Sequence, residues 1–248
     1  MKKAVIVGGS NGIGLSITKK LIKQKYFVYI LDLVTPDTIV LSNSNEYEYI
    51  HCDLINFDDE LFKKLSTDMD INMLLITAGF GRVADFEYLD TTEIDNMFTV
   101  NTIAGIQIIR HFYDRIKSQE PFYCGIMGSI AGLVSSPMFS VYAASKAAIC
   151  RFVESVNIEL ELSGTENRIL NVSPGSIKGT RFNGGDNNLE LTQKLADEII
   201  THMYQRDVLF IPDYEKVYKD VLKRYADNPH AFGISSYEYK KNSGRVRT

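Results

Sequence analysis

Short apolar runs alternate along the chain with longer segments in which apolar residues recur at helical spacing. Residues 4–7 form the first apolar run, and residues 13–25 follow with Leu15, Ile17 and Leu21 on or near one face, as in an amphipathic helix. The alternation predicts further strands at residues 27–31, 48–51, 73–76, 122–127, 168–172 and 208–211. It predicts further helices at residues 58–67, 93–117, 142–162, 191–204 and 213–225.

The predicted strands are apolar along their length, which is typical of parallel strands that are buried on both faces. Strands and helices alternate, and this order favours an α/β fold in which helices cover both faces of a parallel sheet. A chain of 248 residues suits one large domain. We therefore predict a single domain over residues 1–248, with no internal repeat and no linker.

Charge and composition argue against several classes of partner. The net charge is −4, and no concentrated basic face is evident of the kind that a nucleic-acid groove requires. No apolar stretch approaches the roughly 20 residues of a membrane span, and the start of the chain lacks a signal-peptide pattern. Three scattered cysteines fit a reducing cytosol, and the four histidines show no metal-ligand spacing. We expect a cytoplasmic protein without a metal, nucleic-acid or membrane partner.

The predicted first strand runs into a glycine-rich turn that opens the first predicted helix. Such a turn brings backbone N–H groups close to a pyrophosphate, and the helix dipole favours the negative charge. A purely structural turn is the alternative, but the strand before it and the helix after it favour a dinucleotide. The residues of the turn assigned to the cofactor are Gly8, Ser10, Asn11, Gly12, Ile13 and Gly14.

The second predicted strand ends in Asp32, about 20 residues after the glycines. A carboxylate at this distance can accept hydrogen bonds from the adenosine ribose and would repel a 2′-phosphate. The residues that follow it, Leu33 and Val34, carry no positive charge, and neither does Asn11. We expect NAD(H) to be preferred, with NADP(H) not excluded and with Leu33 beside the cofactor. The alternative is that Asp32 only ends the strand as a turn residue.

Tyr142 and Lys146 are four residues apart in a predicted helix, so they share one helix face. A phenol with a pKa of about 10 transfers protons poorly near neutrality, and a neighbouring ammonium is expected to lower that pKa. Ser129 lies thirteen residues earlier, at the end of a strand, where its hydroxyl can hold a reacting oxygen against the phenol. Asn101 lies in an apolar helix and needs partners for its amide. We assign catalytic roles to these four residues, although an ordinary helix start in a Tyr-rich chain is the alternative for Tyr142.

Together these residues closely resemble the short-chain dehydrogenase/reductase family, over about the first 175 residues. The resemblance implies one Rossmann-like domain with a doubly wound, seven-stranded parallel sheet, and an NAD(P)-dependent oxidoreductase acting on a ketone or secondary alcohol. The motifs that carry it, in chain order, are Gly8-x-x-x-Gly12-x-Gly14, Asp32, Asp53, Ala78-Gly79, Asn101, Ser129, Tyr142-x-x-x-Lys146 and Pro174-Gly175.

The resemblance also implies roles for single residues. Asp53 and Leu54 hold the adenine ring, and Ala78-Gly79 passes over the adenosine. Lys146 binds the nicotinamide ribose in addition to its effect on Tyr142, and Asn101 holds a water in a proton relay with Lys146. Ile177, which follows Pro174-Gly175, lies beside the nicotinamide carboxamide.

Several positions depart from the family pattern. Val7 stands before the first glycine in place of the usual Thr, and Thr77 stands before Ala78 in place of the usual Asn; we expect altered hydrogen bonding there. Thr180 is displaced by one residue, so its contact with the cofactor stays open. A short substrate lid is expected at about residues 176–190, where Lys178 and Arg181 suggest a sugar, a polyol or its phosphate. Solvated surface charges are the alternative, and no function is assigned to the tail at about 228–248.

The resemblance further implies a homodimer built from the helices at residues 103–117 and 142–162, with a homotetramer as the alternative. A dinucleotide-binding sensor or scaffold without turnover is the strongest rival function. An epimerase or dehydratase is less compatible, because the longer relatives carry a larger C-terminal substrate domain. The apolar residues expected to supply the dimer surface are Ile106, Ile109, Phe112, Tyr113, Ile149, Phe152, Val153 and Val156.

Overall fold

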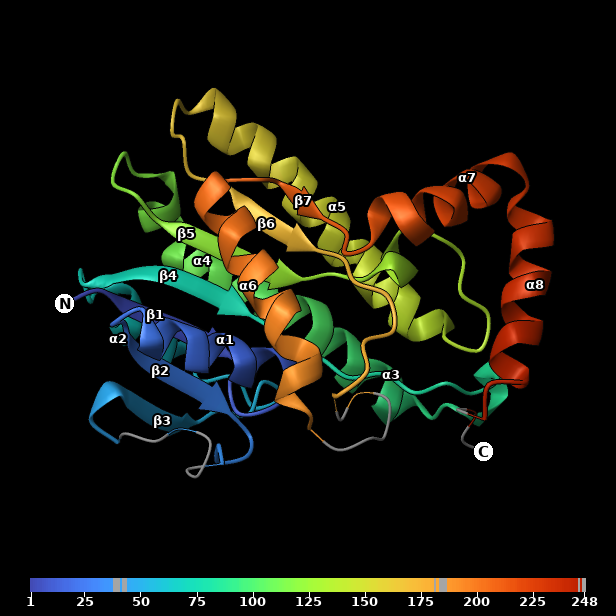
Figure 1. The fold of residues 1–248 in the computed structure, drawn as a ribbon, viewed down its shortest axis with the longest axis horizontal. Helices are drawn as coiled ribbons and strands as arrows, with labels where there is room; N and C mark the ends of the chain where they lie inside the picture. Colours follow the sequence, from blue (N-terminus) through green and yellow to red (C-terminus); the bar gives the residue numbers. More distant parts are fainter. Residues whose placement is uncertain (38–40, 42–43, 181, 183–186, 245, 247–248) are drawn as a thin grey trace.

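A seven-stranded parallel sheet forms the centre of the protein, in the strand order β3-β2-β1-β4-β5-β6-β7 (Figure 1). The computed structural model describes residues 1–37, 41, 44–180, 182, 187–244 and 246. The order reverses direction between β1 and β4, which creates the crevice where ligands bind in open α/β sheets. The strands are β1 Lys3–Val7, β2 Phe27–Asp32, β3 Tyr47–His51, β4 Ile71–Ile76, β5 Tyr123–Met127, β6 Ile169–Val172 and β7 Leu209–Phe210.

Helices cover both faces of the sheet. The helices α1 (Gly12–Lys23) and α6 (Leu189–Gln205) pack together on one face. The opposite face is covered by α2 (Asp59–Ser66), α4 (Ala104–Lys117) and α5 (Ser140–Leu162). The other described helical elements are η1 Ser44–Glu46, η2 Phe86–Tyr88, α3 Thr91–Phe98, η3 Thr99–Ile103, η4 Ile130–Gly132, η6 Tyr214–Tyr218, α7 Lys219–Asp227 and α8 Pro229–Lys241.

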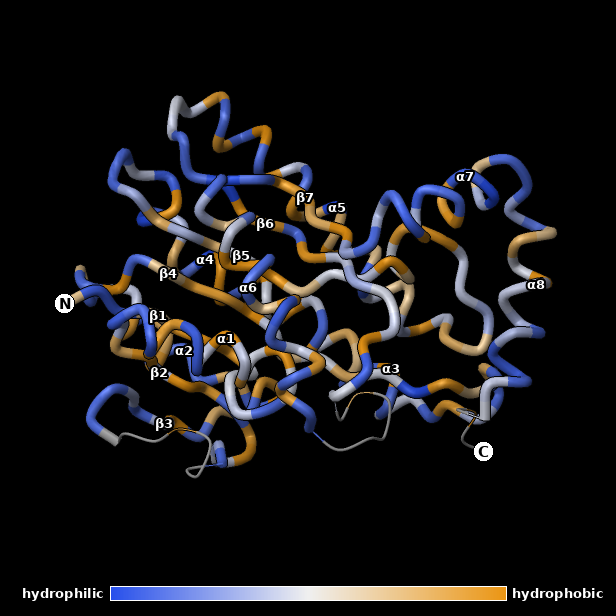
Figure 2. Tube along the Cα trace, viewed as in Figure 1, coloured by the Kyte–Doolittle hydropathy of each residue, from blue (hydrophilic) through white to orange (hydrophobic). Residues whose placement is uncertain are grey.

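The hydrophobic core is divided by the sheet into two layers. Successive strand residues point to opposite faces, so Val5 and Val7 of β1 join the layer under α2, α4 and α5. Ala4 and Ile6 join the layer under α1 and α6. Figure 2 shows the central strands as mostly hydrophobic, in keeping with burial on both faces. The predicted Rossmann-like fold, with its parallel sheet and two helical layers, is confirmed.

The helix predicted over residues 93–117 is interrupted. A π-helical segment, η3, separates α3 from α4. A π segment adds one residue to a turn and leaves backbone groups outside the regular helical ladder, a feature that is frequent at functional sites. Asn101 lies in this segment and is buried.

The C-terminal part differs more from the prediction. The sequence analysis placed one closing helix at residues 213–225 and assigned no helix to the tail after Asn228. The structure instead has η6, α7 and a further helix, α8, of 13 residues. Figure 1 shows α7 and α8 beyond the carboxyl ends of the strands. Gly233 of α8 faces Ser135 and Pro137, so this helix packs against the loop that leads into α5.

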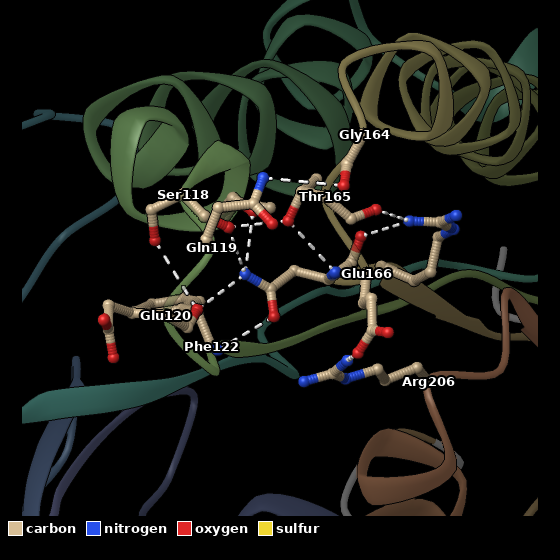
Figure 3. A network of polar contacts seen from close by, with 11 residues as sticks. Ser118, Gln119, Glu120, Phe122, Gly164, Thr165, Glu166 and Arg206 are labelled. Atoms are coloured by element: carbon tan, nitrogen blue, oxygen red, sulfur yellow. Dashed lines mark hydrogen bonds and ion pairs between the residues drawn. The ribbon is translucent and has the colours of Figure 1, made fainter.

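A polar network at the opposite edge of the sheet fixes the amino ends of β5 and β6 (Figure 3). The Asn167 side-chain amide donates to the carbonyl oxygens of Ser118 and Glu120, at 3.0 and 2.8 Å, and its oxygen accepts from the Phe122 N–H. Arg206 forms an ion pair with Glu166 next to it. Because this network lies far from the carboxyl edge, we interpret it as structural.

The described part of the chain contains no helix that is both long enough and apolar enough to span a membrane.

Candidate active site

One cavity of about 370 Å³ opens at the carboxyl ends of the strands and brings together most of the residues predicted from the sequence. Ser10 and Asn101 do not line it and lie behind its wall. The predicted residues that do line it are Gly8, Asn11, Gly12, Ile13, Gly14, Asp32, Leu33, Asp53, Leu54, Ala78, Gly79, Ser129, Tyr142, Lys146, Pro174, Gly175 and Ile177.

The glycine-rich turn requires glycine for steric reasons. Gly8 and Gly12 have positive φ angles of 86° and 50°, which side chains other than glycine rarely adopt. A Cβ on Gly14 would lie 2.0 Å from the Gly8 carbonyl oxygen, so α1 starts in direct contact with the turn. The Thr77 hydroxyl donates to the carbonyl oxygens of Val7 and Gly8, both at 3.0 Å. Altered hydrogen bonding was expected at Thr77, where the family usually has Asn. Through these two hydrogen bonds Thr77 connects the end of β4 to the glycine-rich turn.

Several groups at the turn fit a dinucleotide. The Ser10 hydroxyl is buried and has no hydrogen-bond partner among the described residues, but it does not line the cavity. Asn187 accepts a hydrogen bond from the Gly12 N–H at 3.0 Å and donates to the Asn11 side chain at 2.9 Å. Thr180 contacts the same turn, because a Cβ on Gly12 would lie 3.2 Å from its methyl carbon. The Gly12 N–H thus meets the side-chain oxygen of Asn187 at the helix start, where the helix dipole favours negative charge.

Two carboxylates line the cavity where β2 and β3 end. Asp32 accepts hydrogen bonds from the backbone N–H groups of Ser10, at 3.0 Å, and Val34, at 3.4 Å. Asp53 accepts from the Ile55 N–H and the Asn56 amide. These hydrogen bonds lower the pKa of Asp53, so it stays ionised near neutrality. Among the described residues that line the cavity, Lys146 is the only lysine or arginine.

The opposite end of the cavity holds the predicted catalytic groups. Tyr142, Lys146 and Ser129 are all buried, with exposed fractions of 7%, 2% and 6%. The Lys146 ammonium donates to the Met127 carbonyl oxygen at 2.8 Å and lies 5.8 Å from the centroid of the Tyr142 ring. The Ser129 hydroxyl donates to the Pro174 carbonyl oxygen at 3.4 Å. This bond links the end of β5 to the Pro174-Gly175 turn.

The expected decrease in the pKa of Tyr142 is not found for the protein's own groups. Burial raises the pKa of Tyr142 to about 12, and the hydrogen bond with Ser129 opposes this only in part. Burial lowers the pKa of Lys146 to about 8, because the charged ammonium is desolvated. Near neutrality the phenol is therefore protonated and the ammonium is largely charged.

Asn101 uses its side-chain amide fully. Its oxygen accepts from the Phe80 N–H at 2.9 Å, and its nitrogen donates to the Phe80 carbonyl oxygen at 2.9 Å and to the Ser145 hydroxyl at 3.0 Å. Asn101 therefore links Phe80, in the loop after β4, to Ser145 of α5, the residue directly before Lys146. This provides the partners that an Asn within a helix requires.

The structure adds residues that the sequence analysis did not single out. Phe80 and Phe182 line the cavity, and the Tyr218 hydroxyl lies so close to Gly175 that a Cβ there would be 1.5 Å from it. Phe182 is in the predicted lid, where the sequence suggested a binding role only for the basic residues. Of those, Lys178 is exposed and does not line the cavity, and Arg181 lies outside the described residues. The described residues contain no cluster of His, Cys, Asp and Glu suited to a metal ion.

Comparison with known proteins agrees with this arrangement. The family model for short chain dehydrogenases matches residues 2–191. An uncharacterized oxidoreductase of Saccharomyces cerevisiae is 28% identical over 188 residues, which make up 72% of this chain and 61% of that protein. The chain spans less than two thirds of the length of this relative and of two further curated relatives.

Two solved structures share the fold. A short-chain dehydrogenase from Streptomyces avermitilis matches with a TM-score of 0.77 and 20% identity, over 98% of both chains. A short-chain dehydrogenase from Sphingobium yanoikuyae, solved in complex with NADPH, matches with a TM-score of 0.72 and 18% identity, over 92% of this chain and 96% of that one. The family match covers most of the sequence and the fold agrees with it, so this chain belongs to the short chain dehydrogenase family.

Proposed function

We propose that the protein is an oxidoreductase that transfers a hydride between a nicotinamide dinucleotide and the carbon of a ketone or secondary alcohol. The observation that carries this proposal is that Tyr142, Ser129 and Lys146 lie on one wall of the cavity whose other end is the glycine-rich turn. A panel of ketones, secondary alcohols, sugars and polyols with NAD(H) and NADP(H), followed at the nicotinamide absorbance, tests it. We expect turnover of at least one carbonyl or alcohol; dinucleotide binding without any turnover would favour a sensor or scaffold.

Four side chains of the protein would act on the reacting carbonyl or on its proton donor. When bound, the dinucleotide supplies the hydride acceptor or donor. Tyr142 gives its proton to the carbonyl oxygen in reduction and takes it back in oxidation. Ser129 holds that oxygen beside the phenol, and the charged Lys146 stabilises the phenolate as it forms. Asn101 positions the start of α5, and therefore Tyr142 and Lys146, through its bond with Ser145.

The dinucleotide would be held along the carboxyl edge of β1, β2 and β4. The glycine-rich turn would bind the pyrophosphate, and Asp32 the adenosine ribose, with Leu33 alongside. Asp53 and Leu54 would contact the adenine, Ala78-Gly79 the adenosine, and Ile177 and Lys146 the nicotinamide end. All of these residues except Ser10 of the turn line the cavity.

We infer a preference for NAD(H) over NADP(H), because Asp32 is ionisable and no cation among the described cavity residues lies near it. Asp32→Ala is expected to weaken NAD binding about tenfold to hundredfold, because a hydrogen bond to a charged group is lost. The difference in affinity between NAD and NADP should become smaller. Calorimetric titration of both dinucleotides measures this. Glu48→Ala, an exposed carboxylate on the neighbouring strand β3, is the control and should leave both affinities unchanged. Tighter binding of NADP to the wild type would contradict the preference.

We also propose a single domain and a homodimer formed through the outer faces of α4 and α5. The expected interface residues need correction: five of the eight are packed inside the subunit, because the apolar faces of both helices lie on the sheet. The buried residues are Ile109, Phe112, Ile149, Val153 and Val156. Ile106, Tyr113 and Phe152 are partly buried, and Ile103 and Ile158 are 48% and 56% exposed.

Light scattering at micromolar concentration is expected to give the mass of a dimer. Ile158→Arg should shift the mass towards the monomer, because it places a charge in an apolar contact, while an exposed position such as Ile158 leaves the fold of the subunit intact. Met69→Arg, at an exposed residue outside these helices, is the matched control. A monomeric wild type would refute the interface.

A further inference from the structure

The ring of Tyr142 is held among aromatic side chains. Phe139 stacks on it with a centroid distance of 4.1 Å and an interplanar angle of 21°. Phe182 approaches the same ring at 5.3 Å and 56°, and also contacts Phe139 edge to face at 6.2 Å. The three rings therefore form one cluster, which we call the aromatic cluster, around the proposed proton donor.

The backbone is adapted to this cluster at two places. Met138, directly before Phe139, has a φ of 60° although it is not a glycine. This conformation costs free energy and is typical of functional sites; the Met138 carbonyl oxygen is fixed by the Ala84 N–H at 2.8 Å. Gly81 faces the cluster, since a Cβ there would lie 2.6 Å from the Tyr142 ring and 2.8 Å from the Phe139 ring. Only a residue without a side chain lets the two rings stack in this place.

The open side of the cluster faces the cavity through Phe182. Phe182 lines the cavity together with Phe80, which packs against the buried cluster that contains Tyr142, and Phe182 is 38% exposed. This region next to Tyr142 is apolar, whereas the described carboxylates of the cavity lie at the adenosine end. Lys178 is exposed and does not line the cavity.

We propose that the substrate is a ketone, or the corresponding secondary alcohol, that carries a planar aromatic group next to the reacting carbon. Phe182 is the specificity-determining residue: it provides a ring against which the aryl group packs while the carbonyl oxygen meets Tyr142 and Ser129. Stacked and edge-to-face ring pairs gain free energy beyond the burial of area alone. This inference rests on the proposed oxidoreductase function and replaces a sugar or polyol phosphate as the expected substrate class.

The test compares acetophenone with propanone and dihydroxyacetone phosphate, using the full chain and saturating dinucleotide. We expect the wild type to prefer acetophenone in kcat/KM. Phe182→Ala should raise the KM for acetophenone about tenfold and leave the KM for the dinucleotide and for propanone nearly unchanged. Phe182→Tyr keeps an aromatic ring and should have the wild-type KM for acetophenone. Lys178→Ala is the control and should leave the KM for acetophenone unchanged. A preference for dihydroxyacetone phosphate, or equal effects of Phe182→Ala on acetophenone and propanone, would overturn the proposal.

Equilibrium binding separates this inference from the proposed function. Calorimetry measures acetophenone binding to the dinucleotide-loaded protein and to the loaded Phe182→Ala variant. Weaker binding to the variant without turnover of any carbonyl would uphold the aromatic site and refute the oxidoreductase. Turnover of other ketones without acetophenone binding would refute the aromatic site and leave the oxidoreductase intact.

Discussion

Replacement of Tyr142 by Phe is expected to lower kcat by about 10²- to 10⁴-fold, the usual contribution of a positioned acid or base. The phenyl ring stays and can still stack on Phe139, which lies 4.1 Å away. Only the hydroxyl that carries the proton is lost, so the affinity for the dinucleotide should change little. Steady-state rates at the nicotinamide absorbance and calorimetric titration of the dinucleotide give the two quantities separately.

Tyr123→Phe is a matched control, because it removes a phenolic hydroxyl from β5 at a distance from the cavity. It should keep the wild-type rate. If Tyr142→Phe also kept that rate, Tyr142 would not be the proton donor, and another group would have to supply the proton. If Tyr142→Phe lost dinucleotide binding as well, its effect on kcat could not be assigned to proton transfer.

The protonation states give the form in which Tyr142 and Lys146 start the reaction. Burial raises the pKa of Tyr142 to about 12 and lowers that of Lys146 to about 8. Near neutrality the phenol therefore carries its proton and the ammonium is mostly charged. Oxidation needs the phenolate, which becomes accessible only with further positive charge beside the phenol.

Gly14→Ala is expected to disrupt both stability and dinucleotide binding. The new Cβ would lie 2.0 Å from the Gly8 carbonyl oxygen and 2.6 Å from the Thr77 hydroxyl, and the first of these is backbone that cannot rotate away. Overpacking of this kind costs about 1–3 kcal/mol or more, which corresponds to a decrease in Tm of at least several degrees at this chain length. A displaced turn should also weaken dinucleotide binding about 100-fold. Thermal unfolding and calorimetric titration measure the two effects.

Gly233→Ala is the matched control for this change, because Gly233 also lies within a helix, α8, and its nearest neighbour to a new Cβ is 3.7 Å away. That substitution should be neutral or slightly stabilising, since Ala favours helix over Gly. A Gly14→Ala variant with the wild-type Tm and dinucleotide affinity would mean that the contact between α1 and the turn is looser than the structure indicates.

Much of the fold could be predicted from hydrophobic periodicity, because the inner strands are largely buried on both faces and the long helices are amphipathic. The π segment at Asn101 could not, since one extra residue in a turn leaves the apolar pattern of residues 93–117 nearly unchanged. α8 was missed although it had a local signal: the Asn228 side chain caps the helix by accepting from the Ala231 N–H, and Pro229 stands at the first position. The polar and apolar residues of α8 are not clearly separated onto two faces, so its sequence lacks the pattern of an amphipathic helix.

The candidate site could be predicted where motifs fix residues close in sequence, as in the glycine-rich turn and at Tyr142 and Lys146. Contacts between distant segments could not be derived. Phe182 meets Tyr142 although 40 residues separate them in the sequence, and Tyr218 reaches Gly175 from the C-terminal part. Too many apolar residues were assigned to the dimer surface, because the pattern of one helix does not show which of its apolar residues will pack on the sheet.

The central claim is that a hydride passes directly between the dinucleotide and a carbonyl carbon in the cavity at Tyr142. Transfer of deuterium from NADH labelled at C4 of the nicotinamide to an aryl ketone, followed by mass spectrometry and NMR of the alcohol, tests it most directly. We predict that one deuterium is found on the carbinol carbon with the wild type, and none above background with Tyr142→Phe over the same time. An alcohol without deuterium from either face of the labelled nicotinamide, or no alcohol from any carbonyl compound despite bound NADH, would contradict the account.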